Sequence, residues 1–269
     1  DCMSYERFLE IRANIHFVDK TKIAEDCIDK FFLVRPLINS IRKRCLEKEP
    51  EEFLCIDEQI IPFKGRLNVK QYVKGKPSPW GIKNFVLCGK SGYPYDFVLY
   101  QGKNTEISAF DINAYGFGTA VVLHLMKRIS TPGHSLYFDN YFSSYHLFEV
   151  LHNFKINAAG TVRINRFKNP PFISDKELKL KGRGSSDELV GNNEKVVLVK
   201  WQDNKSIYIA SNYKGKGEEK VVTRWDKKKS KYVDIKQPEV ISDYNFGIGG
   251  VDSLAQLISY YRIFSKSKK

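Results

Sequence analysis

The sequence of 269 residues lacks the cysteine and histidine patterns of common metal and redox sites. Its five cysteines are odd in number and widely spread, and no C-x-x-C pair occurs among them. This spacing argues against a disulfide framework and against a zinc site within this segment. The five histidines form no H-E-x-x-H motif, which argues against a zinc protease of that type.

Two further absences narrow the class of protein. No apolar run reaches the roughly 18 residues that a membrane-spanning helix needs, and no secretory signal opens the chain. No G-x-x-x-x-G-K-[ST] motif is present, which excludes a P-loop nucleotide hydrolase. We therefore expect that the protein has no membrane partner. We also expect it to be located in a reducing compartment, the nucleus.

What the chain does have is positive charge. It carries 44 Lys and Arg against 31 Asp and Glu, and its formal net charge is +13. Such a surplus favours a polyanionic partner, because neutralising phosphates releases counterions and so drives non-specific binding to DNA. A soluble basic protein without such a partner is the alternative. We expect the polyanionic partner to be double-stranded DNA.

The spacing of apolar residues predicts a mixed sheet with helices on its faces. Residues 1–50 have helical periodicity, and the β-type pattern begins at about 52. The expected elements that follow are strands at 53–61, 67–73, 82–88 and 95–101, a helix at 118–129, a strand at 135–139, a helix at 143–152 and a strand at 158–162. Antiparallel strands followed by helix-linked parallel strands indicate an α/β fold like that of ribonuclease H-like nucleases.

A β-rich insertion is predicted to interrupt this fold. Two hairpin patterns, 195–210 and 221–235, follow a basic stretch rich in Pro and Gly, and helical periodicity resumes only at about 248. The expected organisation is a helical region for dimerisation or DNA binding (1–50), the first part of a catalytic core (51–163), a β-rich insertion domain (164–240) and the last, truncated helix of the core (241–269).

Three aspartates are the candidate catalytic residues. Asp57 and Asp139 end or interrupt short apolar runs, and Asp252 follows Gly249-Gly-Val251 at the start of a helical pattern. Each has a simpler interpretation. Asp57 could be an exposed position of an alternating strand, Asp139 a turn residue, and Asp252 a first-turn residue that the helix dipole favours. In the expected sheet the strands at 53–61 and 135–139 are neighbours, which would bring Asp57 and Asp139 together.

Three gathered carboxylates would suit metal-dependent phosphoryl transfer. Two divalent cations about 4 Å apart can activate the attacking oxygen and stabilise the leaving one. Mg²⁺ prefers hard oxygen ligands and keeps several waters, so a few carboxylates are enough to hold it. The sequence therefore predicts Asp57, Asp139 and Asp252 as ligands of two Mg²⁺ or Mn²⁺ ions.

Basic side chains near these acids are candidate DNA contacts. We expect this role for Lys64, Arg66, Lys70, Lys74, Lys76, Arg163, Arg166 and Lys168. Trp201 and Trp225, among the lysines of the insertion, could stack on bases. Solvated strand faces explain such residues equally well. The glycines of 247–250 could cradle a phosphate or simply form a flexible return from the insertion.

Five segments resemble the signature blocks of piggyBac-type transposases and the proteins derived from them. They occur in the family's order and cover nearly the whole chain: Ile56-Asp-Glu-Gln-Ile-Ile-Pro-Phe-Lys-Gly-Arg66, Lys76-Pro-Ser-Pro-Trp-Gly-Ile-Lys83, Phe138-Asp-Asn-Tyr-Phe-Ser-Ser144, Gly160-Thr-Val-Arg163 and Gly249-Gly-Val-Asp-Ser-Leu-Ala-Gln256. The resemblance implies an RNase H-like core with an insertion, a homodimer, metal-dependent cleavage at transposon ends and joining at TTAA targets. It also implies that Asp57, Asp139 and Asp252 form the catalytic triad.

The chain departs from the family's pattern in two ways. The last block of the family usually carries a second acid where this chain has Ala255, three residues after Asp252 and on the same side of a helix. Family members also continue into further helices and a Cys/His-rich zinc domain, neither of which the sequence contains by Lys269. Two other functions therefore stay open: a catalytically inactive, domesticated protein that binds DNA or chromatin, and a general RNase H-like nuclease.

Overall fold

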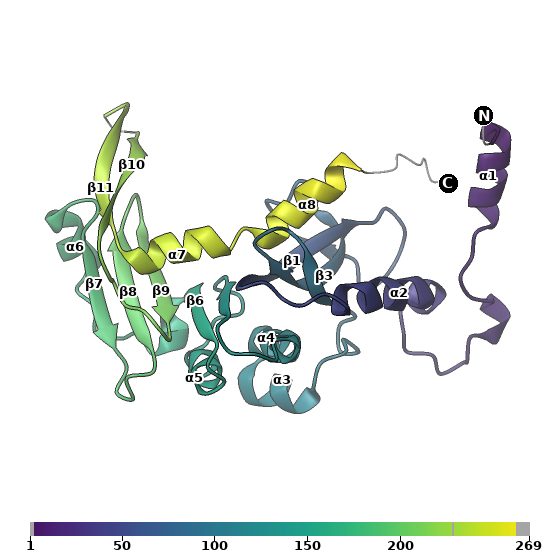
Figure 1. Ribbon diagram of the computed structural model, residues 1–269, viewed down its shortest axis with the longest axis horizontal. Helices are drawn as coiled ribbons and strands as arrows, with labels where there is room; N and C mark the ends of the chain where they lie inside the picture. The colour runs from purple at the N-terminus through teal and green to yellow at the C-terminus, as the bar shows by residue number, and fades with distance from the viewer. Residues whose placement is uncertain (1–2, 228, 262–269) are drawn as a thin grey trace.

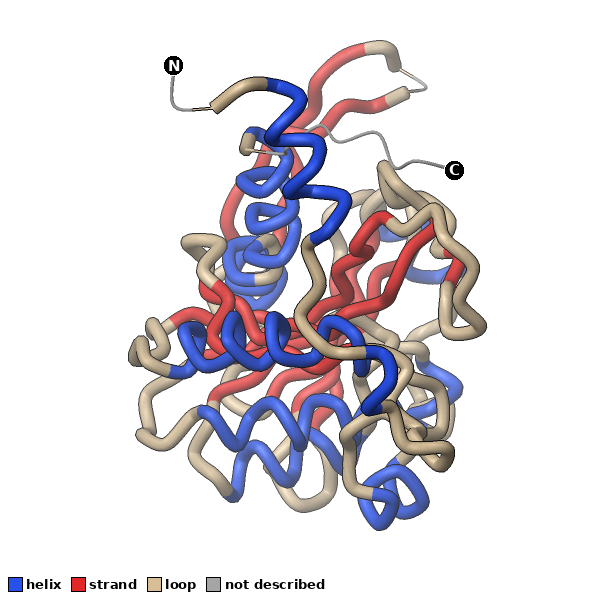
Figure 2. Tube along the Cα trace, turned by 90° about the vertical axis from the view of Figure 1, so that its right-hand side faces the viewer, coloured by secondary structure: helices blue, strands red, loops and turns tan. Residues whose placement is uncertain are grey.

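One mixed sheet of nine strands organises the protein (Figures 1 and 2). The computed structural model describes residues 3–227 and 229–261. The sheet runs in the order β2-β3-β1-β5-β6-β9-β8-β7, and β4 pairs with β3 along the edge that β2 shares. Its strands are β1 (Phe53–Pro62), β2 (Gln71–Tyr72), β3 (Trp80–Gly89), β4 (Pro94–Leu99), β5 (Ser135–Phe138), β6 (Asn157–Thr161), β7 (Ser186–Val190), β8 (Val197–Gln202) and β9 (Ser206–Ser211).

The three central strands are parallel, and the strands on both sides are antiparallel to them. β1 pairs with β5, and β5 with β6, in parallel; β3 and β9 pair in antiparallel fashion with β1 and β6. A separate hairpin consists of β10 (Lys220–Asp226) and β11 (Lys231–Gln237). The expected adjacency of the first strand and the strand at 135–139 is therefore confirmed.

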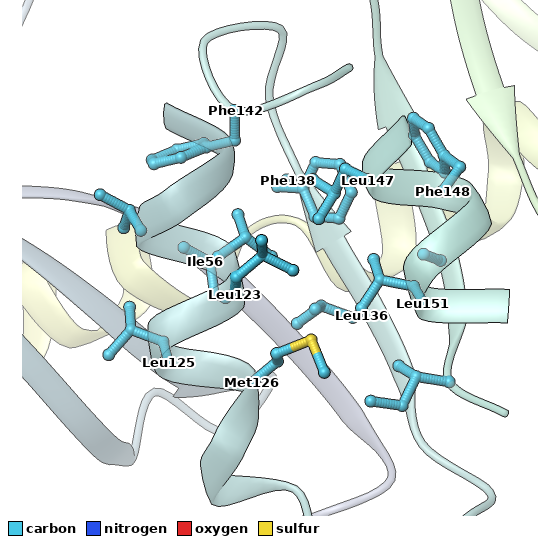
Figure 3. Close-up of a cluster of buried hydrophobic side chains, with 14 of the residues drawn as sticks. Ile56, Leu123, Leu125, Met126, Leu136, Phe138, Phe142, Leu147, Phe148 and Leu151 are labelled. Carbon is cyan, nitrogen blue, oxygen red and sulfur yellow. The ribbon is translucent and has the colours of Figure 1, made fainter. Parts of the chain in front are cut away.

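Helices cover both faces of the sheet (Figure 1). The α-helices are α1 (Tyr5–Asn14), α2 (Arg35–Leu46), α3 (Ala109–Tyr115), α4 (Phe117–Leu125), α5 (Tyr145–Asn153), α6 (Asp175–Lys181), α7 (Glu239–Gly247) and α8 (Gly250–Tyr260). Helices α4 and α5 enclose the larger core, in which Leu136 and Phe138 of β5 meet Leu147 and Leu151 of α5 (Figure 3). Helices α7 and α8 pack on the opposite face, against Cys55 and other buried residues.

Local signals explain several helix ends. Ser144 accepts a hydrogen bond from the backbone N–H of Leu147 and so caps α5. Ser174 and Glu177 form a reciprocal capping box at the start of α6. Pro36 lies in the first turn of α2, where a missing N–H costs nothing. Among the residues that the structure describes, no helix is long and apolar enough to cross a membrane.

Three expectations differ from the structure. The strand expected at 67–73 is reduced to β2, because the turn-rich segment that follows lets only Gln71 and Tyr72 pair with β3. Helix α7 begins at Glu239, well before residue 248, where helical periodicity was expected to resume. Helices α3 and α6 were not predicted, because their sequences have no clear apolar period. The segment 164–240 is β-rich as expected, but its strand β9 pairs with β6, so one sheet continues across the expected boundary at 163.

Candidate functional site

Two of the three aspartates lie side by side where the parallel pairing of two strands ends. β1 and β5 pair as far as Ile56 and Phe138, so Asp57 and Asp139 are the next residue in each strand direction. Side chains alternate between the faces of a sheet, which places Asp57 on the same face as Cys55. That face packs against α7 and α8, so the two carboxylates lie beneath the helices rather than in the apolar core around Ile56.

Asp57 is a largely buried carboxylate. Its side chain is 18% exposed, and its Oδ1 accepts a hydrogen bond of 2.7 Å from the backbone N–H of Glu58. Burial raises the pKa of Asp57 to about 7, and the negative charges of Glu58 and Asp139 add to this effect while Lys76 opposes it. A carboxylate with a raised pKa among other acids is a group that a cation would stabilise.

Asp139 is held in place by the turn that follows β5. Its Oδ1 accepts from the backbone N–H of Tyr141 at 2.8 Å, and its backbone oxygen accepts from Ser143 Oγ at 3.1 Å. Burial raises the pKa of Asp139 and the charge of Glu58 adds to the rise, whereas the Tyr141 hydrogen bond and Arg163 oppose it. The charged forms of both Asp57 and Asp139 are therefore disfavoured.

Asp252, on α8, is linked to Asp57 through Lys76. The Lys76 Nζ lies 3.5 Å from Asp252 Oδ1 and 4.0 Å from Asp57 Oδ2. Burial alone would lower the pKa of Lys76, but Asp57, Asp252 and Glu58 together raise it. The ammonium group thus bridges the two acids, although Asp252 itself is 75% exposed.

Glycine allows α8 to approach the sheet closely enough for this contact. A Cβ on Gly250 would lie 2.4 Å from the backbone oxygen of Gly89 and 2.9 Å from the sulfur of Cys55. A Cβ on Gly247 would collide with the ring of Tyr137. Gly247 and Gly250 therefore allow α7 and α8 to pack closely against the sheet. Neither a phosphate cradle nor a flexible return from the insertion accounts for these two glycines.

The acids do not form a ready-made metal cage. Within 3–227 and 229–261, no group of three or more His, Cys, Asp or Glu side chains lies close enough together to hold a metal ion. The structure brings Asp57 and Asp139 together and links Asp252 to Asp57 through a lysine. The cationic group between the acids marks a place that favours positive charge.

The predicted DNA contacts divide into two groups. Among the described residues, Lys64, Arg66, Lys70 and Lys74 are in no ion pair, which leaves their charge available. Arg163 and Arg166 instead donate to Asn140 and Tyr141, at 2.8 Å from Arg163 Nε to Asn140 Oδ1. These two arginines hold the turn that carries Asp139. Lys168 ends the short 3-10 helix at 164–167 in a left-handed conformation.

Sequence reasoning assigned some roles wrongly and missed others. Trp201 cannot stack on a base, because it is 1% exposed and its indole N–H donates to the backbone oxygen of Lys236. Lys76, expected only as a DNA contact, is the residue that joins two of the acids. Tyr244 of α7 was not considered; it is half-buried, desolvation raises its pKa to about 12, and the nearby charges of Asp139 and Asp57 add to the shift.

Comparison with known proteins gives this site a context. A family model described as "Transposase IS4" matches residues 1–269. The human PiggyBac transposable element-derived protein 3 is 34% identical over 273 residues, which cover 99% of this chain and 45% of that protein. The chain belongs to the piggyBac transposase family. A second human member, PiggyBac transposable element-derived protein 2, is 28% identical over 275 residues, 100% of this chain and 45% of its own length.

The architecture also matches that of a solved piggyBac protein. The cryo-EM structure of a piggyBac transposase synaptic complex with hairpin DNA superposes with a TM-score of 0.74 at 25% sequence identity. The match covers 96% of this chain and 51% of that one. The chain thus spans about half the length of the piggyBac proteins it matches, and it has the fold of a piggyBac-type transposase core.

Proposed function

We propose that this chain is the catalytic core of a cut-and-paste DNA transposase. It would cleave DNA strands at transposon ends and join them into TTAA-type targets. Both reactions would be phosphoryl transfers that use two Mg²⁺ or Mn²⁺ ions. The protein would act in the nucleus as a homodimer. The observation that carries the proposal is the adjacency of Asp57, within β1, and Asp139, just after β5, where the parallel pairing of these strands ends beneath the helix that bears Asp252.

The strand order supports an RNase H-like arrangement of this core. Three antiparallel strands in the order β4-β3-β1 are followed by the parallel strands β5 and β6, and helices α4 and α5 occupy the two connections into and out of β5. Ligand sites of open α/β sheets lie beyond the carboxyl ends of parallel strands, where Asp139 follows β5.

The donors present suit hard divalent cations. Carboxylate oxygens of Asp57 and Asp139 are the ligand type that Mg²⁺ prefers, and burial among like charges makes both carboxyls gain from a nearby cation. Asp57, Asp139 and Asp252 would hold the ions, with Asp252 joining once it leaves Lys76. Bound there, the ions would activate the attacking oxygen and stabilise the leaving one.

The remaining residues orient the acids and hold DNA. The backbone N–H groups of Glu58 and Tyr141 hold Oδ1 of Asp57 and of Asp139, and Oδ2 of Asp57 faces Lys76. Arg163 and Arg166 stabilise the turn of Asp139. The unpaired cations of 64–74 would bind phosphates without reading sequence.

Cleavage of a transposon-end oligonucleotide tests the proposal directly. With Mg²⁺ or Mn²⁺ we expect the wild-type chain to nick the DNA and the Asp139→Ala variant to leave it intact. Glu239→Gln, which removes a carboxylate paired with Lys214, is a control that should nick like wild type. Cleavage without metal, or equal nicking by Asp139→Ala, would contradict the proposal.

A second function is favoured by two observations at the same site. Asp252 is paired with Lys76, and Ala255 supplies no second acid on α8. A transposase-derived protein that keeps the scaffold and binds DNA without cleaving it would have these features. It predicts DNA affinity that falls steeply with salt and does not change in Asp57→Ala. Metal-stimulated strand transfer would exclude it.

A further inference from the structure

A concave site that none of the three aspartates lines lies on the protein surface. It has a volume of about 660 Å³ and is lined by Phe63, Lys64, Lys70, Pro79 and Trp80, among others. Pockets that bind small organic molecules have volumes of about 300 to 1,000 Å³. The site therefore has room for a planar group the size of a nucleic acid base.

Exposed aromatic rings form one wall of this site. Trp80 is 55% exposed, and its ring centroid lies 5.0 Å from that of Tyr72 at an angle of 53°. Phe63 is also exposed. Large aromatic side chains at the surface of a soluble protein are informative when they cluster. We call Phe63, Tyr72, Trp80, Lys64 and Lys70 the Trp80 shelf.

Positive charge lies directly beside these rings. Lys70 donates to the backbone oxygen of Gly65 at 3.1 Å, and its Nζ lies 5.5 Å from the centroid of the Trp80 ring. Within the described part of the chain, neither Lys64 nor Lys70 pairs with an acid. An apolar stacking surface next to uncompensated cations is complementary to a base with its phosphate, and it is not complementary to a purely apolar partner.

The shelf is connected to the acid site by the same chain segments. Phe63 comes directly after the end of β1, the strand that carries Asp57, and Trp80 is the first residue of β3, four residues after Lys76 in the segment between β2 and β3. Six residues of extended chain span ~20 Å, which equals about six base steps of B-form DNA at 3.4 Å each. A DNA strand with a phosphate at the acids can therefore reach the shelf.

We propose that the Trp80 shelf binds an unpaired DNA base, which stacks on Trp80 while Lys64 and Lys70 contact its phosphates. The faces of bases within a duplex are covered by their neighbours, so an exposed ring can stack only on a base that has left the helix. This proposal rests on the DNA-binding part of the proposed function and not on catalysis. It assigns to the shelf the recognition of a strand opened near the cleavage site.

A fluorescent base reports stacking on the shelf. The full chain is mixed, in EDTA, with a duplex that carries 2-aminopurine at one unpaired position, and with the same duplex fully paired. We expect the wild type to quench 2-aminopurine emission and to bind the unpaired DNA on the order of 10-fold more tightly. Trp80→Ala should lose the quenching and the preference but keep its affinity for the paired duplex. Trp80→Phe, which retains a ring, should keep most of both and so separates stacking from misfolding.

Trp225 provides a matched control. It is 48% exposed and lies 5.1 Å, centroid to centroid, from Tyr232 on the β10–β11 hairpin, which also carries lysines. Trp225→Ala should quench and discriminate like wild type. Loss of the preference in Trp225→Ala but not in Trp80→Ala would overturn the proposal.

The remaining outcomes separate this proposal from the proposed function. Asp57→Asn should keep the preference for an unpaired base, because the shelf does not need the metal site. Binding to duplex without any preference would overturn the shelf alone, whereas failure of the wild type to bind any DNA would overturn both. Self-association that Trp80→Ala abolishes, without base quenching, would identify a second copy of the chain as the occupant and also overturn it.

Discussion

Two lysines each lie between two carboxylates, and the two clusters differ in how well they are satisfied. Lys214 Nζ is 2.9 Å from Glu239 Oε1 and 2.8 Å from Asp243 Oδ2, and this pairing lowers the pKa of Glu239. Lys76 is 4.0 Å and 3.5 Å from its partners, and burial raises the pKa of Asp57 to about 7 despite the lysine. The Lys214 cluster ties α7 to the segment after β9, whereas the Lys76 cluster leaves its acids short of positive charge.

The difference indicates that the Lys214 cluster is a structural ion pair and that the Lys76 cluster is a site suited to a cationic ligand. Charges that only hold elements together gain from short, complete pairing, and their pKa values move toward the charged forms. Acids kept together at a cost to their own ionisation are typical of functional sites. Buried Asp57 and Asp139, with pKa values raised by burial, fit the second description.

The largest expected effect is on DNA cleavage. Asp57→Asn should reduce metal-dependent nicking by at least about 100-fold, since loss of even an outer-sphere partner of a metal ligand costs 10- to 100-fold. Glu239→Gln, in the Lys214 cluster, should cleave at the wild-type rate under conditions where both proteins are folded. Initial rates on an end-labelled oligonucleotide measure both. A larger loss in Glu239→Gln would contradict the distinction.

For the free energy of unfolding, we expect the Lys214 cluster to matter more than the Lys76 cluster. Lys214→Met should lower the free energy of unfolding by about 1 kcal/mol, because two carboxylates lose a hydrogen-bonded partner. Lys76→Met should lower it less, because Asp57 can take up a proton in place of its cation. Urea unfolding at pH 7 compares the two. Equal losses would show that the Lys76 cluster is as structural as the other.

The pH dependence of stability should reveal Asp57. Its folded-state pKa of about 7 lies above the ordinary value of 3.8, so folding favours its neutral form. The associated stability is present below about pH 4 and is lost as the pH rises through 7. In EDTA, Asp57→Asn should therefore be more stable than wild type by roughly 1–3 kcal/mol at pH 8 and equal to it at low pH. A difference that is constant from pH 4 to 8 would contradict the assignment.

The smallest effect concerns Ala255. Ala255→Asp places a carboxylate one helical turn from Asp252, and we expect it to raise Mn²⁺ affinity by no more than about fivefold. Ser259→Asp, two turns along α8 from Asp252, is the matched control and should leave the affinity unchanged. Equal affinities for all three proteins would show that Ala255 does not influence the site.

Local patterns predicted the core of the fold and the pair at its centre. Apolar runs at 53–61 and 135–139, in an order of elements like that of ribonuclease H-like nucleases, placed β1 beside β5 and therefore Asp57 beside Asp139. The helix at 143–152 could be predicted because Ser144 is a favourable cap. Both signals lie within a few residues of the element that they specify.

What could not be predicted depends on contacts between distant segments. No local signal shows that β9 extends the sheet from β6, because the pairing joins Gly160 to Ala210 across many residues. Lys76 is one of several lysines in a turn, and only the folded loop places it between Asp57 and Asp252. Trp80 likewise gave no sign that it would be exposed beside Tyr72.

Metal binding tests the central claim most directly. Mn²⁺ is titrated by isothermal calorimetry into the metal-stripped wild type and into Asp57→Asn, Asp139→Asn and Glu239→Gln. If Asp57 on β1 and Asp139 just after β5 form the metal site, the wild type and Glu239→Gln bind Mn²⁺ alike, and both aspartate variants lose that binding. Undiminished binding in Asp57→Asn and Asp139→Asn would contradict the account.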